Sequence, residues 1–485
     1  MKIIQITAAY KPAYIYGGPT MSVAKLCECV ASKEVGKSGS WRVGELAIEE
    51  NNNYDPPPTP PINRSELSKG GHNGANLIAQ CGEINIKVFT TTANGKSELE
   101  VEPNKCVIVD GVEVTYFKRL TKDHTHFSPA LLWGLRKEIL VNKKNPPPTP
   151  AKGGQHLVIH IHAWWNLVSV LSCMVAKLYN IPVILSPRGM LTTYTNTNRN
   201  SVAKKLIHYS LGKKLLKYCH IHATSEQEKQ DILSIVTPKS ITVIPNLVAL
   251  GDSLKHVTLP SDQRTKLESL KQFALPSLQE ALVPIYRKGS GVRSPRINNS
   301  TAQPLPFKLI FLSRIEEKKG LDLLFEALAN FNVNWSLTIA GSGDEEYILS
   351  LKTKAESLKL NHNYWIGQVK NEDKFKLLAE HDLMVLTSHN ENFANVVIES
   401  LSVGTPVLLS DQVGLADYIL TKDLGWVSEL NADSINHSLH LAFNDQIKRS
   451  RLRKSAPSLI NEDFNDEILV EKYFNLYENL ANGRL

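Results

Sequence analysis

Residues 389–411, HNENFANVVIESLSVGTPVLLSD, decide the fold because they join two apolar strands through a polar loop and a short helix. The run before them, Leu383 to Leu386, is predicted to be a buried strand. A helix is predicted from Asn395 to Val403, with Asn395 as its N-cap and Gly404 as its C-terminal glycine. The next apolar strand is Val407 to Leu409. This order of elements indicates an open α/β sheet.

Two carboxylates have positions that this segment defines. Glu391 lies on the loop at the carboxyl end of the first strand, and Glu399 lies about one turn inside the helix. Backbone N–H groups at the start of a helix bind phosphate, and open α/β sheets bind ligands beyond the carboxyl ends of their strands. The segment therefore predicts a site for a small anionic ligand, although the spacing alone fits two solvated glutamates equally well.

The pattern Glu391-x7-Glu399, with the turn Gly404-Thr405-Pro406 after it, resembles the signature of family four of the retaining, nucleotide-sugar-dependent glycosyltransferases. The resemblance implies the GT-B fold, in which two Rossmann-like domains face each other across a cleft. It also implies that Glu391 is catalytic and contacts the donor sugar, and that Glu399 binds the ribose. Three neighbours join the donor site by the same resemblance: Phe393, Ala394 and Asn395. The family has glycines after its first glutamate, whereas this chain has Asn392-Phe393-Ala394, so side chains stand where the family has none.

The composition is that of a globular protein. The 485 residues are enough for two or three domains, and the net charge of +7 comes from basic residues that are dispersed along the chain. The six cysteines show no paired metal spacing, so a reduced, cytoplasmic protein is the simpler interpretation. The N-terminal apolar run is too short for a signal peptide, and no stretch approaches the roughly 20 apolar residues of a membrane-spanning helix. We expect a soluble protein that has no nucleic-acid partner.

The densest basic segment is Ser201 to Lys217, whose apolar residues fall near one helical face and whose lysines lie elsewhere. Such a helix could lie on an anionic membrane surface. A surface helix that packs its apolar stripe into the core is the simpler interpretation. A peripheral contact with the inner face of a membrane therefore stays open.

Regular strands and helices alternate through both halves of the chain, which indicates parallel, doubly wound sheets. Strands are predicted at Lys2–Thr7, Ile86–Thr90, Val107–Phe117, His156–Ile161, Pro182–Leu185, His220–Ala223, Ile241–Ile244, Phe307–Ser313, Ser336–Ala340 and Asp382–Leu386. Helices are predicted at Met21–Val30, Ser128–Leu140, Leu167–Leu178, Glu226–Ser234, Leu321–Ala329 and Asp466–Leu480.

Three irregular stretches interrupt this alternation, at about 32–74, 143–154 and 251–306. The string Pro-Pro-Pro-Thr-Pro occurs in the first two, which indicates low-complexity loop insertions and no structural repeat. The predicted organisation is an N-terminal acceptor-side domain at 1–250, an inter-domain insertion at 251–306, a nucleotide-sugar-binding domain at 307–464, and a C-terminal helix at 465–485 that packs back onto the first domain.

Polar groups follow several strands of the first half. Gly17-Gly18 comes after the first strand, and the resemblance places this pair along the donor site. His162 ends a strand, where a lone histidine is more often a structural hydrogen-bonder, but the resemblance makes it a catalytic candidate that faces the donor sugar. Arg188 follows the next strand and is a candidate contact for an acidic acceptor or for the donor diphosphate.

The second half carries a cationic pair at a strand-to-helix turn. Arg314 ends a strand and Lys319 precedes a helix, as in a clamp for a diphosphate, although a solvated charge cluster has the same composition. The family has Arg-x4-Lys-Gly here, which implies that both residues hold the donor phosphates. Val369 lies where the family holds the nucleotide base through backbone groups. Gly341-Ser342-Gly343 lacks the other features of a dinucleotide fingerprint, so no such site is predicted.

The resemblance implies transfer of a hexose from a UDP- or GDP-linked donor to a hydroxyl of a glycan or lipid-linked glycan, with retention of configuration, in cell-surface polysaccharide synthesis. No Asp-x-Asp motif occurs in the sequence, so protein cations are expected to stabilise the leaving phosphate without a metal or another cofactor. A sugar-nucleotide epimerase, a phosphorylase on the same fold and a catalytically silent binding paralogue remain as alternatives.

Overall fold

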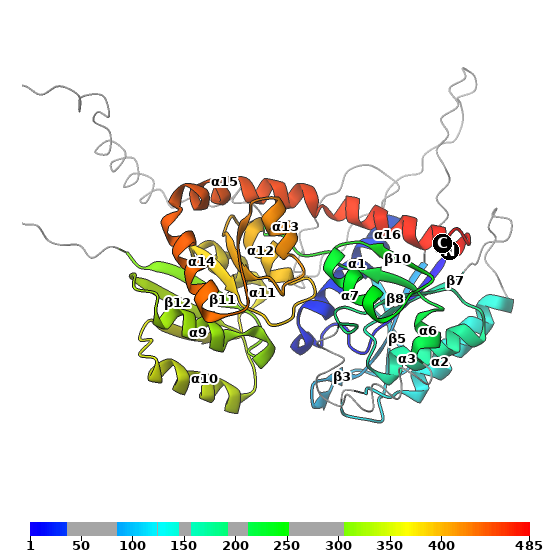
Figure 1. Ribbon diagram of the computed structural model, residues 1–485. Coiled ribbons are helices and arrows are strands. Elements are labelled where there is room, and N and C mark those ends of the chain that lie inside the picture. Colours follow the sequence, from blue (N-terminus) through cyan, green and yellow to red (C-terminus); the bar gives the residue numbers. More distant parts are fainter. Residues whose placement is uncertain (36–84, 124, 145–156, 193–211, 252–304) are drawn as a thin grey trace, which may run out of the picture.

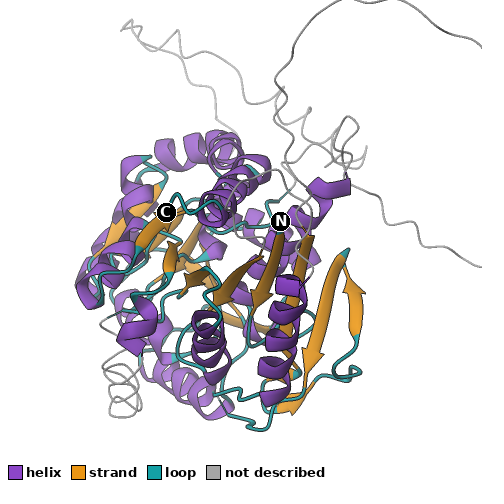
Figure 2. Ribbon diagram, turned by 90° about the vertical axis from the view of Figure 1, so that its right-hand side faces the viewer, coloured by secondary structure: helices purple, strands orange, loops and turns teal. Residues whose placement is uncertain are grey.

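The computed structural model describes residues 1–35, 85–123, 125–144, 157–192, 212–251 and 305–485. They form two domains, each built on a mainly parallel sheet with helices packed around it (Figures 1 and 2). The predicted α/β class with two doubly wound Rossmann-like domains is confirmed. Apart from a few residues at their ends, the three irregular stretches predicted at about 32–74, 143–154 and 251–306 lie outside the described residues.

The first sheet has the strand order β10-β9-β8-β7-β1-β2-β6-β5. Its strands are β1 (Lys2–Ile6), β2 (Asn85–Thr91), β5 (Cys106–Val109), β6 (Val112–Phe117), β7 (Leu157–His162), β8 (Val183–Ser186), β9 (His220–Ala223) and β10 (Ser240–Val243). All neighbours are parallel except β5 and β6. Every residue of β7 is buried, as expected for a central strand that has helices on both faces.

The single strand predicted over Val107–Phe117 is wrong, because β5 and β6 form an antiparallel hairpin there. Val109 pairs with Val112 across a two-residue turn of Asp110 and Gly111. Both turn residues have positive φ, 48° and 78°, which is the backbone that a tight hairpin needs and that Asp-Gly favours.

Two of the described helices of the first domain begin at residues whose side chains cap them. The described helices of this domain are η1 (Tyr14–Tyr16), α1 (Gly18–Val35), α2 (Pro129–Lys144), α3 (Leu167–Leu178), α6 (Lys213–Leu216) and α7 (Glu226–Ile235). Asn166 caps α3 by accepting a hydrogen bond from the Ser169 amide at 2.8 Å, and Ser225 caps α7 by accepting one from the Glu228 amide at 3.1 Å. A small hairpin of β3 (Ala93–Asn94) and β4 (Ser97–Glu98) lies outside the main sheet.

The second sheet is fully parallel and has the order β13-β12-β11-β14-β15-β16. Its strands are β11 (Phe307–Leu312), β12 (Trp335–Ala340), β13 (Asn363–Gly367), β14 (Leu383–Leu386), β15 (Val407–Ser410) and β16 (Gly425–Ser428). The helices around it are η3 (Glu317–Lys319), α9 (Leu321–Ala329), α10 (Glu345–Ser357), α11 (Asn371–Ala379), α12 (Asn395–Ser402), α13 (Ala416–Thr421) and α14 (Ala432–Asn444).

Two helices at the end of the chain connect the domains (Figure 1). α15 (Gln446–Asp463) packs on α12 of the second domain, whereas α16 (Asp466–Ala481) contacts α1 and β7 of the first. Tyr477 of α16 is completely buried, and its hydroxyl lies 2.9 Å from Nδ1 of His160. The last helix therefore contributes to the core of the first domain. Within the described part of the chain, every helix is too short or too polar to cross a membrane.

Candidate active site

The loop after β11 carries Arg314 and is held by two glycines that follow β12. A Cβ added to Gly341 would lie 1.8 Å from the carbonyl oxygen of Ser313, and one added to Gly343 would lie 2.1 Å from that of Ile315. Only glycine permits backbones to approach this closely. These two glycines belong to the motif that was not predicted to bind a dinucleotide. Their role is to fix the backbone on both sides of Arg314.

Lys319 lies directly before α9, against the loop that follows β14. Gly320, the next residue, has a φ of 64°, and a Cβ there would lie 2.0 Å from the carbonyl oxygen of Thr387. The Thr387 hydroxyl donates to the carbonyl oxygen of Gly320 at 2.7 Å. The two loops thus pack backbone to backbone, which brings Lys319 beside Glu391.

Glu391 forms an ion pair and a hydrogen bond with Lys319 through its Oε2. Its amide donates to the carbonyl oxygen of Gln412 at 3.1 Å, which holds the residue beside the loop after β15. Burial by itself would raise the pKa of the Glu391 carboxyl, but the charges of Lys319, Lys318 and Arg314 outweigh it, so the pKa lies below its ordinary value of 4.5. The carboxylate is therefore ionised at neutral pH.

The second predicted carboxylate has a lysine of its own. Glu399 lies on α12, and its Oε1 is 2.7 Å from Nζ of Lys374 on α11. Both side chains are largely buried, at 12% and 16% exposure, so the pair is well shielded from solvent. Lys374 was not predicted, because a pairing between two helices leaves no local signal in the sequence.

The start of α12 differs from the prediction. Ala394, with φ 60° and ψ 73°, is the N-cap, and Asn395 is the first helical residue, so the predicted capping role of Asn395 is wrong. The Asn395 side chain instead reaches the first domain, where its Oδ1 accepts from Asn246 Nδ2 at 3.1 Å. Phe393 is 2% exposed and packs edge to face on Phe464, with ring centroids 6.0 Å apart. Phe393 thus belongs to the hydrophobic core.

The glycine pair of the first domain lies against this part of the second domain. A Cβ on Gly17 would lie 3.9 Å from Nε of Arg314, and one on Gly18 would lie 3.5 Å from Nδ2 of Asn395. Gly17 also has a φ of 66°, which favours glycine. The loop after β1, Arg314 and the N-terminus of α12 therefore adjoin one another, as their predicted shared site requires.

Arg188 and His162 belong to one buried network. Arg188 donates from Nε to Nδ1 of His162 at 3.3 Å, and from Nη1 to Ser22 Oγ at 2.9 Å and Asn246 Oδ1 at 2.7 Å. Because Nδ1 of His162 accepts, its proton is on Nε2, which donates to Gln5 Oε1 at 2.7 Å. Burial first, and then the neighbouring His160 and Arg188, lower the pKa of His162 well below 6.5. The ring is neutral, and both its nitrogens are engaged within the first domain.

Asn392 was not predicted as a site residue, yet it connects the two domains. Its Nδ2 donates to Thr224 Oγ1 at 2.7 Å, and its carbonyl oxygen accepts from Ser225 Oγ at 3.2 Å. Its Cβ is close to the Arg188 loop, since a Cβ added to Gly189 would lie 2.8 Å from it. The departure from the family's glycine at this position was the available signal.

Glu228 is a second residue that the sequence did not reveal. It is 2% exposed and accepts from the amides of Gly189 and Thr224, each at 2.7 Å. Burial raises its pKa, although these hydrogen bonds oppose the shift. The side chain thus holds together the loops after β8 and β9, and with them Arg188.

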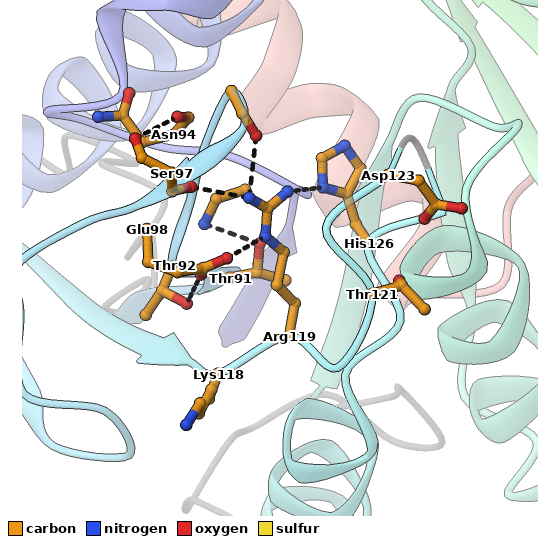
Figure 3. A network of polar contacts seen from close by, with 12 residues as sticks. Thr91, Thr92, Asn94, Ser97, Glu98, Lys118, Arg119, Thr121, Asp123 and His126 are labelled. Atoms are coloured by element: carbon orange, nitrogen blue, oxygen red, sulfur yellow. Dashed lines mark hydrogen bonds and ion pairs between the residues drawn. The ribbon is translucent and has the colours of Figure 1, made fainter.

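Arg119 holds together the loops around the β3–β4 hairpin of the first domain (Figure 3). Its side chain is fully buried and donates to Glu98 Oε1 at 2.6 Å and to the carbonyl oxygens of Gly95 and Ser97 at 2.9 and 2.8 Å. The Gly95 amide in turn donates to the Tyr16 hydroxyl at 3.0 Å. The β3–β4 hairpin is therefore fixed to η1, the element that leads into Gly17.

Val369 is half-buried and lies between β13 and α11, the helix that carries Lys374. Among the described residues, no three His, Cys, Asp or Glu side chains are grouped so that they could hold a metal ion.

Two family profiles match the chain, one in each domain. Residues 78–251 match Glycosyltransferase Family 4, and residues 296–459 match Glycosyl transferases group 1. The chain belongs to glycosyltransferase family four. The predicted family and its GT-B fold are confirmed.

Relatives and solved structures agree with this assignment. Glycogen synthase of Mycobacterium tuberculosis is 21% identical to the glycosyltransferase over 84% of this chain and 89% of its own length. An uncharacterised glycosyltransferase of Methanocaldococcus jannaschii is 29% identical over 35% of this chain, which spans 44% of that relative. Among solved structures, sucrose-phosphate synthase of Thermosynechococcus elongatus has a TM-score of 0.61 at 16% identity, covering 99% of both chains. HepE of Anabaena in complex with UDP-glucose has a TM-score of 0.59 at 14% identity, covering 98% of this chain and 99% of that one.

Proposed function

We propose that this glycosyltransferase moves a hexose from a nucleotide sugar to a hydroxyl of a glycan or lipid-linked glycan, with retention of configuration. The observation that carries the proposal is the meeting of Arg314, Lys319 and ionised Glu391 at the N-terminus of α12, next to Gly17 of the other domain. Cations and backbone N–H groups suit a diphosphate, and a carboxylate suits a sugar carbon that becomes positive.

The donor diphosphate would bind Arg314, Lys319 and the first amides of α12. These groups offset the negative charge that develops on the leaving phosphate, which makes its departure easier. Glu391 orients the sugar and stabilises positive charge on its ring, and the acceptor hydroxyl attacks from the side that the nucleotide leaves. Since Lys319 already neutralises part of its charge, we assign Glu391 this electrostatic role and not that of a covalent nucleophile.

Glu399 would hydrogen-bond the ribose of the nucleotide, and Val369 would lie beside the base. Lys374 keeps Glu399 oriented, and Gly18 and Ala394 line the donor with their backbones. His162 and Arg188 form the opposite side, where Arg188 meets an acidic acceptor or the diphosphate. The proposal needs no metal or other cofactor, because lysine and arginine provide the positive charge.

The donor would be UDP- or GDP-linked; the likeness to a UDP-glucose complex supports UDP. The similarity to a glycogen synthase supports a polysaccharide acceptor. We place the reaction in the cytoplasm, at the inner face of the membrane, for a lipid-linked acceptor in cell-surface polysaccharide synthesis.

The test compares wild type with Glu391→Gln, and uses Glu356→Gln, an exposed glutamate on α10, as the matched control. With a panel of nucleotide sugars and glycan acceptors, Glu391→Gln should lower kcat by about 10²-fold or more and leave UDP binding unchanged, because the charge acts in the transition state. NMR of the product anomer tests retention. Binding without turnover by wild type would favour a silent paralogue, and interconversion of donors without an acceptor would favour an epimerase.

A further inference from the structure

Three neighbouring helices of the first domain carry a large excess of positive over negative charge. Residues 129–144, 167–179 and 213–218 contain eight of the 55 lysines and arginines and one of the 48 acids. Their own net charge is therefore +7, as large as that of the whole chain. We name their outward side the basic face; its cations are Arg136, Lys137, Lys143, Lys144, Lys177, Lys213, Lys214 and Lys217.

The basic face is one continuous surface. α2 contacts α3, and α3 contacts α6, in the same region of the first domain (Figure 1). Lys177 donates to the carbonyl oxygen of Lys214 at 3.3 Å, and Lys143 donates to that of Tyr179 at 2.8 Å, so the cations of neighbouring helices adjoin. Seven of the eight are exposed, whereas the single acid, Glu138, is largely buried and paired with Lys2.

Apolar and aromatic side chains lie among these cations. Trp133 is 67% exposed, Val141 48% and Leu178 72%. Arg136 stacks over the Trp133 ring at 5.3 Å, and Lys143 lies 5.5 Å from the centre of the Tyr179 ring. Exposed tryptophan and leucine are costly in water, so their presence on one charged surface points to a partner that is both anionic and apolar.

We propose that the basic face docks onto the surface of an anionic phospholipid membrane. Each lysine or arginine near such a surface contributes favourably, and tryptophan and leucine enter the boundary between headgroups and acyl chains. A nucleic acid or an acidic polymer would match the charge but would leave Val141 and Leu178 without a partner. α6 belongs to the basic segment predicted from the sequence; its Leu215 and Leu216 are buried and its lysines exposed, while residues 201–211 lie outside the described residues.

The purpose of docking, which is to bring the enzyme to a lipid-linked acceptor, rests on the proposed function. Membrane binding itself needs neither donor nor turnover, and so it is measured separately from catalysis.

The experiment is sedimentation of the full chain with phosphatidylcholine vesicles, with and without phosphatidylglycerol, in the absence of any donor. Wild type should bind only the anionic vesicles, and less as salt increases. Lys137→Glu, Lys144→Glu and Lys217→Glu combined should reduce binding at least about tenfold. The control carries the same charge change on exposed lysines of the second domain, Lys352→Glu, Lys359→Glu and Lys454→Glu, and should bind as wild type does.

A separate Trp133→Ala variant tests the apolar part and should reduce the binding that remains at high salt. Circular dichroism verifies that each variant is folded. The proposal is overturned if wild type does not bind anionic vesicles, binds neutral vesicles equally well, or binds heparin or RNA in preference to vesicles. It is equally overturned if the control and the basic-face variant lose binding to the same extent.

Discussion

Lys319 and Glu391 are partners in the described structure, and the lysine is also the proposed ligand of the donor phosphates. Lys319→Met removes the largest of the charges that lower the Glu391 pKa and leaves the burial that raises it. The pKa should therefore rise, and the acid limb of the profile of kcat/KM against pH should move to higher pH. The profile is measured from about pH 4 to about pH 8, where the limb reports the free enzyme. Lys352→Met, an exposed lysine on α10, should leave the limb in place.

The side chain of Asn392 forms a hydrogen bond between the two domains. Asn392→Gly removes the hydrogen bond to Thr224 that joins the two domains. Such a bond contributes about 1 kcal/mol, so its loss should shift the equilibrium between joined and separated domains roughly fivefold towards separation. We expect a larger radius of gyration by small-angle X-ray scattering in the absence of donor. Thr224→Ser keeps the hydroxyl and is the control. If Asn392→Gly scatters like wild type, the contact does not influence domain closure.

At the scale of elements, the junction of two loops at Gly320 is decisive for placing Lys319. Gly320→Ala puts a Cβ into the carbonyl of Thr387 at a φ of 64°. Gly483→Ala is a matched control, because Gly483 has nearly the same φ, 65°, and nothing within 4 Å of its added Cβ. Gly320→Ala should therefore lower the free energy of unfolding by about 1–3 kcal/mol more than the control does, as urea titration measures. Equal losses would show that only the φ matters.

Two helices with a strong apolar stripe were predictable from the sequence, whereas α14 was missed although it also buries one face. The bounds predicted for α3 and α9 match the observed ones, because both helices bury a regular apolar stripe. β13 was missed, since it is a half-exposed edge strand. α10 and α11 were also missed, as their surfaces are mainly polar and their apolar residues few.

The candidate site was predictable where a motif carried it and not where tertiary contacts create it. Glu391, Lys319 and Arg314 come together as the strand ends of a parallel sheet require. The left-handed cap at Ala394 was not predictable, because packing of the loop overrides the capping preference of Asn395. The same holds for Glu228, whose partners lie on two separate loops.

At the scale of the whole molecule, buried histidines make stability depend on pH. Burial and then Arg188 lower the pKa of His222 to about 3, against about 6.5 in the unfolded chain. Between these values the unfolded chain binds a proton that the folded one does not, so stability is complete above about pH 6.5 and is lost as pH falls. His160 and His162 act in the same direction.

The free energy of unfolding should thus fall by up to about 1.4 kcal/mol per pH unit for each of these histidines. Urea titrations at several pH values below 7 measure the slope. His222→Asn should give a shallower slope than wild type, whereas His437→Asn, at an exposed position, should not change it. A slope that stays the same in His222→Asn would contradict the assignment.

The return of α16 to the first domain has a consequence for biosynthesis. The hydroxyl of Tyr477 hydrogen-bonds to Gln5 and His160, and that of Tyr473 hydrogen-bonds to His222. Both tyrosines lie on α16, which is translated after the whole second domain. A nascent chain that ends before Asp466 leaves this polar cluster beside β7 without its two tyrosine partners, although its bonds within the first domain remain possible. The first domain therefore completes this buried network only once α16 has been synthesised.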